Sequence, residues 1–198
     1  MDRRNFLVGA AAATFVPFAL ASSGKAGKLP QDGVEWFTDV EVTAQDGRTF
    51  KFYDDLLKGK VVLVNFFFTG CDALCPLVME NLSAVQDLLG PRIGKDVFMY
   101  SITLQPELDT QAVLAAYAKT YGAGPGWLLL TGKPGNIDLL RHRLGFVESN
   151  PVEDANLEAH IAAIRIGDVP MHRWIMSPGL VNPNVIVGAV KRAAPERA

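Results

Sequence analysis

A mostly apolar run, from Lys60 to Phe68, constrains the fold more than any other part of this 198-residue chain. The run reads KVVLVNFFF, is rich in Val and Phe, and lies between Gly59 and Gly70. Short continuous apolar runs bounded by turn residues are typical of strands that are covered on both faces. The sequence therefore predicts a central strand in this region, and a pair of cysteines follows it at once.

The segment after the cysteines has the periodicity of a helix. Apolar residues recur at i, i+4, i+7 and i+11, which builds one buried stripe, and Gly-Pro then ends the pattern. The stripe consists of Val78, Leu82, Val85 and Leu89, and the Gly-Pro pair is Gly90-Pro91. Cys71 and Cys75 are therefore expected where a strand ends and a helix begins.

This position predicts reactive cysteines. In an α/β sheet the carboxyl ends of strands bind ligands, and the positive end of a helix dipole stabilises a thiolate. The i, i+4 spacing of Cys71 and Cys75 is expected to direct both sulfurs to one point in the first helical turn. Two convergent thiolates suit a soft metal ion such as Cu(I), and they suit reversible disulfide chemistry equally well. A passive disulfide is a third alternative, but so short a loop stabilises a fold little.

Further strands and helices alternate along the rest of the chain. A hairpin is predicted around Asp46-Gly47 within Trp36–Phe52, because this dipeptide favours tight turns. Later strands are expected at 97–103, 127–130, 159–166 and 173–176, the last two meeting at a turn through Gly167-Asp168. Later helices are expected after Asp109, which is predicted to cap the first of them, at 134–144 and at 184–192. This alternation predicts a three-layer α/β sandwich, with a mixed sheet, helices on both faces and an antiparallel last pair of strands at one edge.

Composition bounds the functional classes. The chain is 49% hydrophobic and 20% charged, which is typical of a globular domain. Its formal net charge is −2 and its basic residues are scattered, so no nucleic-acid partner is expected.

The N-terminus has the pattern of an export signal. Arg3 and Arg4 precede an apolar stretch that runs to Leu20, and small residues end it. We expect a signal at 1–21, of the twin-arginine type, a flexible lead-in at 22–35 and one domain at 36–198. The apolar stretch is shorter than a bilayer span, which favours cleavage, with an uncleaved membrane tether as the alternative. The expected location is the periplasm or another extracytoplasmic compartment.

Several motifs resemble the Sco/SenC family of thioredoxin-like copper proteins. The segments are VVLVNFFFTGCDALCP, SITLQPELDT and YGAGPGWLLLTG, supported by WFTDVEV and FYDDLLKGK. The similarity runs from about Trp36 to about Met176, with the motifs in family order. It implies a thioredoxin-like sandwich, and a copper ion bound by the two cysteines and a distant histidine. In this family that site serves assembly of the dinuclear copper centre of cytochrome c oxidase.

Three histidines compete for the role of third ligand. His142 lies between two arginines on a predicted helix, and His172 lies near a turn. His160 opens an apolar strand after a polar loop, where the residues alone leave a structural role equally open. The resemblance assigns His160, because the ligand histidine of the family also opens a strand after an acidic loop.

Three positions depart from the family pattern. Asp72 stands where the family usually has a proline near the first cysteine, and Gln105 stands where it usually has an acidic residue. Ala159 replaces the Asp that often precedes the ligand histidine. Asp72 is expected to oppose thiolate formation in part, while attracting a cation.

The resemblance therefore predicts a copper metallochaperone with Cys71, Cys75 and His160 as ligands. Its expected partners are the copper-site subunit of cytochrome c oxidase, a thioredoxin-like reductant and another copper carrier. The alternative is a thiol–disulfide oxidoreductase in which Cys71 attacks and Cys75 resolves, keeping target cysteines reduced. A peroxidase is a weaker third hypothesis, because the sequence shows no peroxidase-type constellation around a lone cysteine.

Overall fold

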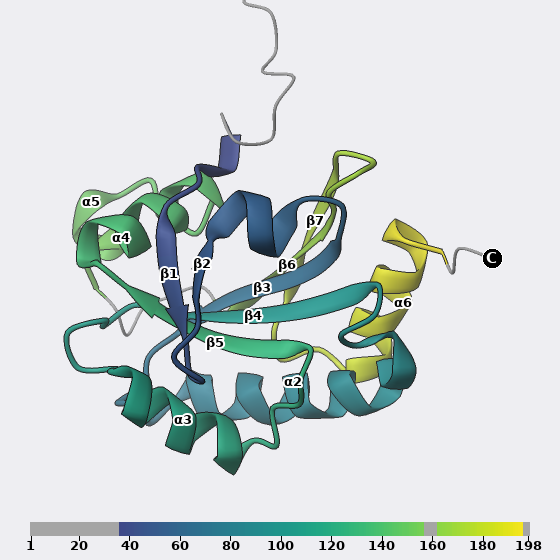
Figure 1. Ribbon diagram of the computed structural model, residues 1–198, viewed down its shortest axis with the longest axis horizontal. Helices are drawn as coiled ribbons and strands as arrows, with labels where there is room; N and C mark the ends of the chain where they lie inside the picture. The colour runs from purple at the N-terminus through teal and green to yellow at the C-terminus, as the bar shows by residue number, and fades with distance from the viewer. Residues whose placement is uncertain (1–35, 157–161, 196–198) are drawn as a thin grey trace, which may run out of the picture.

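A computed structural model describes residues 36–156 and 162–195 of the chain. The predicted export signal, the lead-in and His160 lie outside these residues. The described residues form a mixed seven-stranded sheet in the order β2-β1-β5-β4-β3-β6-β7, with helices on both faces (Figure 1). The predicted three-layer architecture is therefore confirmed.

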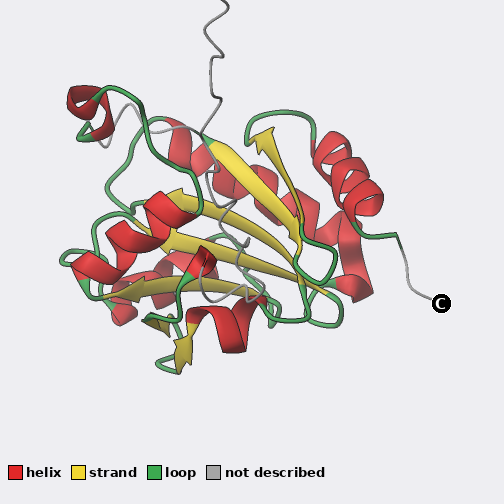
Figure 2. Ribbon diagram, turned by 90° about the horizontal axis from the view of Figure 1, so that it is seen from above, coloured by secondary structure: helices red, strands yellow, loops and turns green. Residues whose placement is uncertain are grey.

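The strands β1 to β7 are Glu41–Ala44, Thr49–Lys51, Val61–Phe67, Val97–Thr103, Trp127–Gly132, Ala163–Asp168 and Arg173–Pro178. The helices α2 to α6 are Leu74–Leu89, Gln111–Thr120, Pro134–Arg143, Pro151–Asp154 and Pro183–Ala193. Two short helical segments complete the elements, η1 at Phe52–Leu57 and η2 at Gly90–Arg92. Figure 2 shows the twisted sheet between its helices. No helix in the described parts of the chain is long and apolar enough to cross a membrane.

Strand β3 lies inside the sheet and is buried along its whole length. It pairs in parallel with β4 and antiparallel with β6. Alternate side chains of a strand point to opposite faces, so both faces of β3 need cover. On one face Leu63 and Phe67 pack with α2, α3 and α6, and on the other Val62 and Val64 pack with η1 and α4. The predicted central strand is confirmed.

A line of buried polar groups crosses the sheet through β3, β4 and β5. The Ser101 hydroxyl donates to Asn65 Oδ1 at 2.6 Å, and Trp127 Nε1 donates to Ser101 Oγ at 3.0 Å. Buried polar atoms are costly unless they are paired, so a slip of either strand would break these bonds. Asn65, the single Asn within the apolar run, thus helps to fix the register of β3, β4 and β5 and therefore where these strands end relative to one another.

Most predicted elements coincide with observed ones, but several boundaries differ. The strand predicted at 159–166 is described as β6 at Ala163–Asp168, so it begins later than predicted within the described residues and continues through Gly167 and Asp168, where the sequence predicted a turn. Helix α3 begins after Thr110, whose side chain accepts a hydrogen bond from Val113 N–H, so the prediction that Asp109 caps this helix is wrong. Helix α2 begins at Leu74, so Cys71 lies before the helix. Pro76 explains this boundary, because a proline further inside a helix would clash with the preceding turn and lack its hydrogen bond. Sequence analysis also missed η1 and α5.

Gly126 offers a direct test of the packing between the start of β4 and β5. A Cβ atom at Gly126 would lie 2.2 Å from the backbone nitrogen of Gly94, whereas one at Gly135 would meet nothing within 4 Å. Gly126→Ala is expected to lower the free energy of unfolding by about 1–3 kcal/mol. Gly135→Ala should raise it by about 0.5–1 kcal/mol, because alanine favours a helix. Urea unfolding of both variants measures the difference, and equal midpoints would contradict this packing.

Candidate metal centre

Cys71 and Cys75 lie at the carboxyl end of β3 and the N-terminus of α2, as the sequence predicts. Both are free and partly exposed, and their side chains are hydrogen-bonded to each other. Cys71 N–H also donates to Phe68 O at 3.3 Å, which folds the loop back on the end of the strand. The sulfurs therefore converge although only Cys75 lies within the helix.

The two thiols differ in acidity because their surroundings differ. Burial by itself would raise the pKa of Cys71, but hydrogen bonds from Cys75 and from the backbone amides of Ala73 and Leu74 lower it overall. These amides belong to the start of α2, where a helix leaves N–H groups unpaired. Burial raises the pKa of Cys75 to about 12, and the hydrogen bond with Cys71 adds to this effect. The pair therefore loses its first proton at Cys71.

A buried carboxylate holds the loop that carries the cysteines. Asp109 accepts a hydrogen bond from Thr69 N–H at 3.1 Å, and the hydroxyls of Thr69 and Thr103 donate to it as well. Thr69 lies just after β3 and Thr103 ends β4, so Asp109 ties together two strand ends beside the thiols. Sequence analysis missed this role, because the bonds join segments that are far apart in the chain.

The candidate histidines occupy different places. His172 follows β6 in a tight turn, and Asp168 at the end of β6 pairs with Val61, the first residue of β3. His172 therefore lies at the opposite end of the sheet from the thiols. His142 lies on α4, with its Nε2 atom 3.6 Å from Asp138 Oδ1 and 3.3 Å from an Arg141 nitrogen. The third candidate, His160, is outside the described residues.

The cysteines form a two-donor site in the part of the chain that the structure describes. Residues 36–156 and 162–195 contain no group of three or more His, Cys, Asp or Glu side chains that could hold a metal ion. Asp72, next to Cys71, is exposed to solvent. The described residues thus supply two soft sulfur donors at this position.

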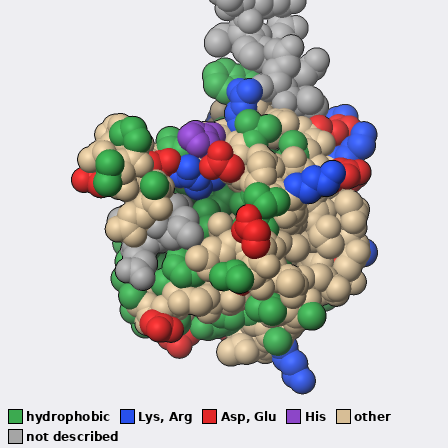
Figure 3. Space-filling view, turned by 90° about the vertical axis from the view of Figure 1, so that its left-hand side faces the viewer, with side chains coloured by type: hydrophobic (Ala, Val, Ile, Leu, Met, Phe, Trp, Pro, Cys, Tyr) green, Lys and Arg blue, Asp and Glu red, His purple; other side chains and the backbone are tan. Residues whose placement is uncertain are grey.

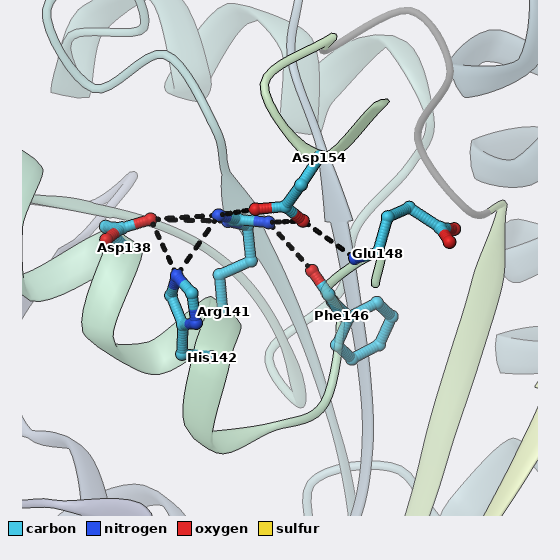
Figure 4. A network of polar contacts seen from close by, with 6 residues as sticks. All are labelled: Asp138, Arg141, His142, Phe146, Glu148 and Asp154. Atoms are coloured by element: carbon cyan, nitrogen blue, oxygen red, sulfur yellow. Dashed lines mark hydrogen bonds and ion pairs between the residues drawn. The ribbon is translucent and has the colours of Figure 1, made fainter. Parts of the chain in front are cut away.

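A buried arginine holds the chain that leads toward His160. The Arg141 guanidinium binds both carboxylate oxygens of Asp154, at 2.6 and 2.8 Å, and donates to Phe146 O at 3.1 Å (Figure 4). Asp154 also accepts from Glu148 N–H at 2.8 Å, and Asp138 contacts the other side of Arg141. Helix α4 is thereby joined to α5, which ends at Asp154, six residues before His160 in the sequence.

The acidity difference between the thiols predicts unequal alkylation. At pH 8, iodoacetamide is expected to modify Cys71 about tenfold or more faster than Cys75, because only a thiolate reacts. Mass spectrometry of the cysteine peptides measures both rates, with Cys71→Ser and Cys75→Ser as single-thiol controls. Equal rates at the two cysteines would show that the start of α2 does not lower the pKa of Cys71 relative to that of Cys75.

The Arg141–Asp154 pair predicts a pH-dependent loss of stability. Hydrogen bonds from Arg141 hold the pKa of Asp154 well below its ordinary value. The resulting stabilisation is complete above about pH 4 and is lost as the pH falls through the pKa of the folded state. Arg141→Met is expected to lower the free energy of unfolding at pH 7 by about 1–3 kcal/mol. This loss should shrink below about pH 4.

Asp138→Asn is the matched control, because Asp138 binds the same guanidinium from an exposed position. The free energy of unfolding of Asp138→Asn should fall by less than about 1 kcal/mol, as for other surface ion pairs. Urea unfolding at pH 7 and at pH 3 distinguishes the variants. Equal losses in both, or a loss in Arg141→Met that does not change with pH, would contradict the importance of the Asp154 contact.

Comparison with known proteins gives relatives that are named as Sco proteins. A SCO2-like protein from Rickettsia felis is 32% identical over 107 residues, which cover 54% of this chain and 50% of that protein. A SCO1 protein homolog from Bacillus subtilis is 33% identical over 89 residues, covering 44% of this chain and 45% of that protein. The chain thus spans about half the length of the curated relatives it matches first.

Solved structures match over more of the chain. A SCO1/SenC family lipoprotein from Bacillus anthracis superposes with a TM-score of 0.64 at 26% identity, covering 78% of this chain and 92% of that one. The ScoI protein of Bradyrhizobium japonicum, solved with copper bound, superposes with a TM-score of 0.62 at 25% identity, covering 77% and 96%. Residues 32–168, more than half of the chain, match the SCO1/SenC family model. The chain therefore belongs to the SCO1/SenC family and has the thioredoxin-like fold of Sco proteins.

Proposed function

We propose that this protein binds a copper ion through Cys71, Cys75 and His160, and delivers it to the dinuclear copper site of a cytochrome c oxidase. The observation that carries the proposal is the pair of free, hydrogen-bonded thiols at the start of α2. Two convergent soft donors fit Cu(I) better than hard cations such as Mg²⁺, which prefer oxygen. The copper-bound ScoI of Bradyrhizobium japonicum supports the choice of metal.

Strand register supports His160 as the third donor. Strand β6 runs antiparallel to β3, with Val64 opposite Arg165, so the residues that begin β6 lie beside the carboxyl end of β3. Ala162 O accepts a hydrogen bond from Gly179 N–H at 2.6 Å, which holds the start of this strand against the chain beyond β7. His160 precedes Ala162 by two residues. Both described histidines face other partners or another end of the sheet, which favours His160.

The surroundings of the thiols suit ligand exchange with another protein. Leu74 and Leu77 in the first turn of α2 are 39% and 50% exposed, and Leu108, beyond the end of β4, is 68% exposed. Figure 3 views the molecule from the end where β3, β4 and β5 finish, and it shows hydrophobic side chains below a more charged upper part. Such apolar residues beside a metal site fit contact with an acceptor protein. The acceptor's own cysteines would then displace the ligands one at a time.

A second candidate function is thiol–disulfide exchange, and the unequal acidity of the thiols favours it. Cys71, with its lowered pKa, has the character of an attacking thiolate, whereas the protonated Cys75 has that of a resolving thiol. This chemistry would keep the cysteines of a copper-site target reduced. It requires no histidine, so His160 separates the two functions.

We also propose that the protein works outside the cytoplasm. The paired arginines and the apolar stretch that follows them support export by the twin-arginine route, either with cleavage or with retention as a tether. A copper carrier that depends on two thiols in an oxidising compartment needs a reductant there. We therefore include a thioredoxin-like reductant and another copper carrier among the proposed partners.

Anaerobic copper titration of the reduced protein tests the proposal. The wild type is expected to bind one copper ion per chain. Competition with a Cu(I) chelator measures the affinity, and thiolate-to-copper charge-transfer absorption after oxidation reports the bound thiolates. His160→Ala should weaken binding by about 100-fold or more, because a direct ligand matters at least as much as the groups around it. His172→Ala is the matched control, because His172 lies at the far end of the sheet, and its affinity should stay at the wild-type value.

Two outcomes would overturn the proposal. Absence of stoichiometric copper binding by the wild type would exclude the chaperone function. Wild-type affinity in His160→Ala would remove the third ligand and favour thiol–disulfide exchange.

A further inference from the structure

A cavity lies at the carboxyl end of β5, between the beginnings of α3 and α4. Its volume is about 400 Å³, and its lining includes Thr131 and Gly132 from the end of β5, Thr110 before α3 and Lys133 before α4. The two helices pack on opposite faces of the sheet (Figure 1). Neither cysteine lines the cavity, so it is distinct from the candidate metal centre.

Three threonine side chains form a row along this cavity. Thr43 pairs with Thr131 on β5 and with Thr49 on β2, so the three side chains lie beside one another on one face of the sheet. Thr131 is only 8% exposed, and its hydroxyl has no hydrogen-bond partner in the part of the chain that the structure describes. A buried hydroxyl is costly unless it is paired, so this one is a donor for a molecule that fills the cavity.

Helix α4 begins at this cavity without a side-chain cap. Its N-cap residue is Lys133, whereas the side chains of Thr110, Asn150 and Asn182 cap α3, α5 and α6. The start of a helix has unpaired amides and the positive end of the helix dipole, so a lysine there is unfavourable by itself. Within the described residues Lys133 has no ion-pair partner, and the first turn of α4 contains no acidic side chain. The start of α4 therefore favours an anion.

Helix α2 shows what an uncapped start can do in this protein. Its N-cap residue, Ala73, offers no side-chain hydrogen bond, and the unpaired amides of its first residues instead stabilise the negative form of Cys71. At α2 the chain itself supplies the group that becomes negative. At α4 the same kind of helix start lies at a cavity, which has room for an anion from outside.

One carboxylate opposes an anion in this cavity. Glu41, at the start of β1, lines the cavity and is exposed to solvent. Its backbone oxygen accepts a hydrogen bond from Asn136 Nδ2 at 3.0 Å, which joins β1 to the first turn of α4. Water screens an exposed carboxylate strongly, whereas the buried Thr131 is screened much less. Glu41 should therefore weaken the binding of an anion without preventing it.

We propose that this cavity binds a small tetrahedral oxyanion, either free phosphate or a small phosphate ester. The several oxygens of such an anion accept hydrogen bonds from threonine hydroxyls and from the first turn of α4, while the Lys133 ammonium balances its charge. Thr110 retains a donor for this purpose, because its oxygen already accepts from Val113 N–H. A carboxylate has fewer oxygens and would use fewer of these donors. The proposal involves neither thiol and is independent of copper binding.

Calorimetric titration of the full chain with sodium phosphate, in a chloride buffer, tests the proposal. The wild type is expected to bind one phosphate ion per chain. Lys133→Met and Thr131→Val should each weaken binding by about tenfold or more, because hydrogen bonds to a charged partner are strong. Glu41→Gln should strengthen binding, by up to about fivefold, because it removes an exposed charge that repels the anion.

Lys119→Met is the matched control, because it removes an exposed lysine from the last turn of α3, far along the helix from the cavity. Its affinity for phosphate should equal that of the wild type. Urea unfolding shows whether each variant is folded. Amide NMR spectra of the wild type locate the anion without any substitution, and the largest shifts on adding phosphate are expected within residues 131–136.

Four outcomes would overturn the proposal. They are a wild type that binds neither phosphate nor glycerol phosphate, amide shifts confined to other residues, an equal loss of affinity in Lys119→Met and Lys133→Met, and an affinity for acetate as high as that for phosphate. Tighter binding of glycerol phosphate than of inorganic phosphate would support an ester as the ligand. The reverse order would support the free ion.

Discussion

The buried carboxylate of Asp109 fixes the place at which the sheet meets the thiol loop. Thr69 and Thr103 lie at the ends of neighbouring parallel strands, and Asp109 binds both of them. Parallel strands carry no short turn that could hold their ends in line, so a side chain has to do so. Because Thr69 is two residues from Cys71, the geometry of the thiol loop depends on hydrogen bonds made inside the protein.

The two cysteines have different chemistry although only three residues lie between them in the chain. Cys71 lies just before α2, where unpaired amides stabilise negative charge. Cys75 lies in the first turn and packs against the core, where burial favours the neutral thiol. Pro76 sets this division, since it prevents the helix from starting early enough to include both residues. The same asymmetry would suit both thiol exchange and stepwise release of a metal, so the thiols alone do not choose between the two proposed functions.

The part of the molecule that leads to His160 is held by different forces. Arg141 and Asp154 form a shielded ion pair that joins α4 to α5 (Figure 4). On the other side of His160, the pairing of β6 with β3 and β7 holds the chain at the thiol end of the sheet. One side thus depends on charge and the other on the backbone ladder. A change of pH would therefore affect the α4 side more than the strand side.

Periodic patterns in the sequence predicted most of the fold. The apolar run of β3, the stripe of α2 and the Asp46-Gly47 turn depend on neighbours a few residues apart, which a single sequence displays directly. The missed segments, η1 and α5, are short and lack such a period. The cysteine pair and its position at a strand end could also be predicted, because residues 67 to 76 contain the whole junction.

The sequence by itself thus determined which residues form the buried strand, the helix after it and the pair of thiols between them. The choice of His160 came from family resemblance, because spacing along the chain does not show which histidine reaches the thiols. Only the tertiary structure showed that His172 lies at the far end of the sheet and that Asp109 binds two strand ends instead of capping α3. Each of these facts depends on contacts between segments that are distant in the chain, and local patterns carry no record of such contacts.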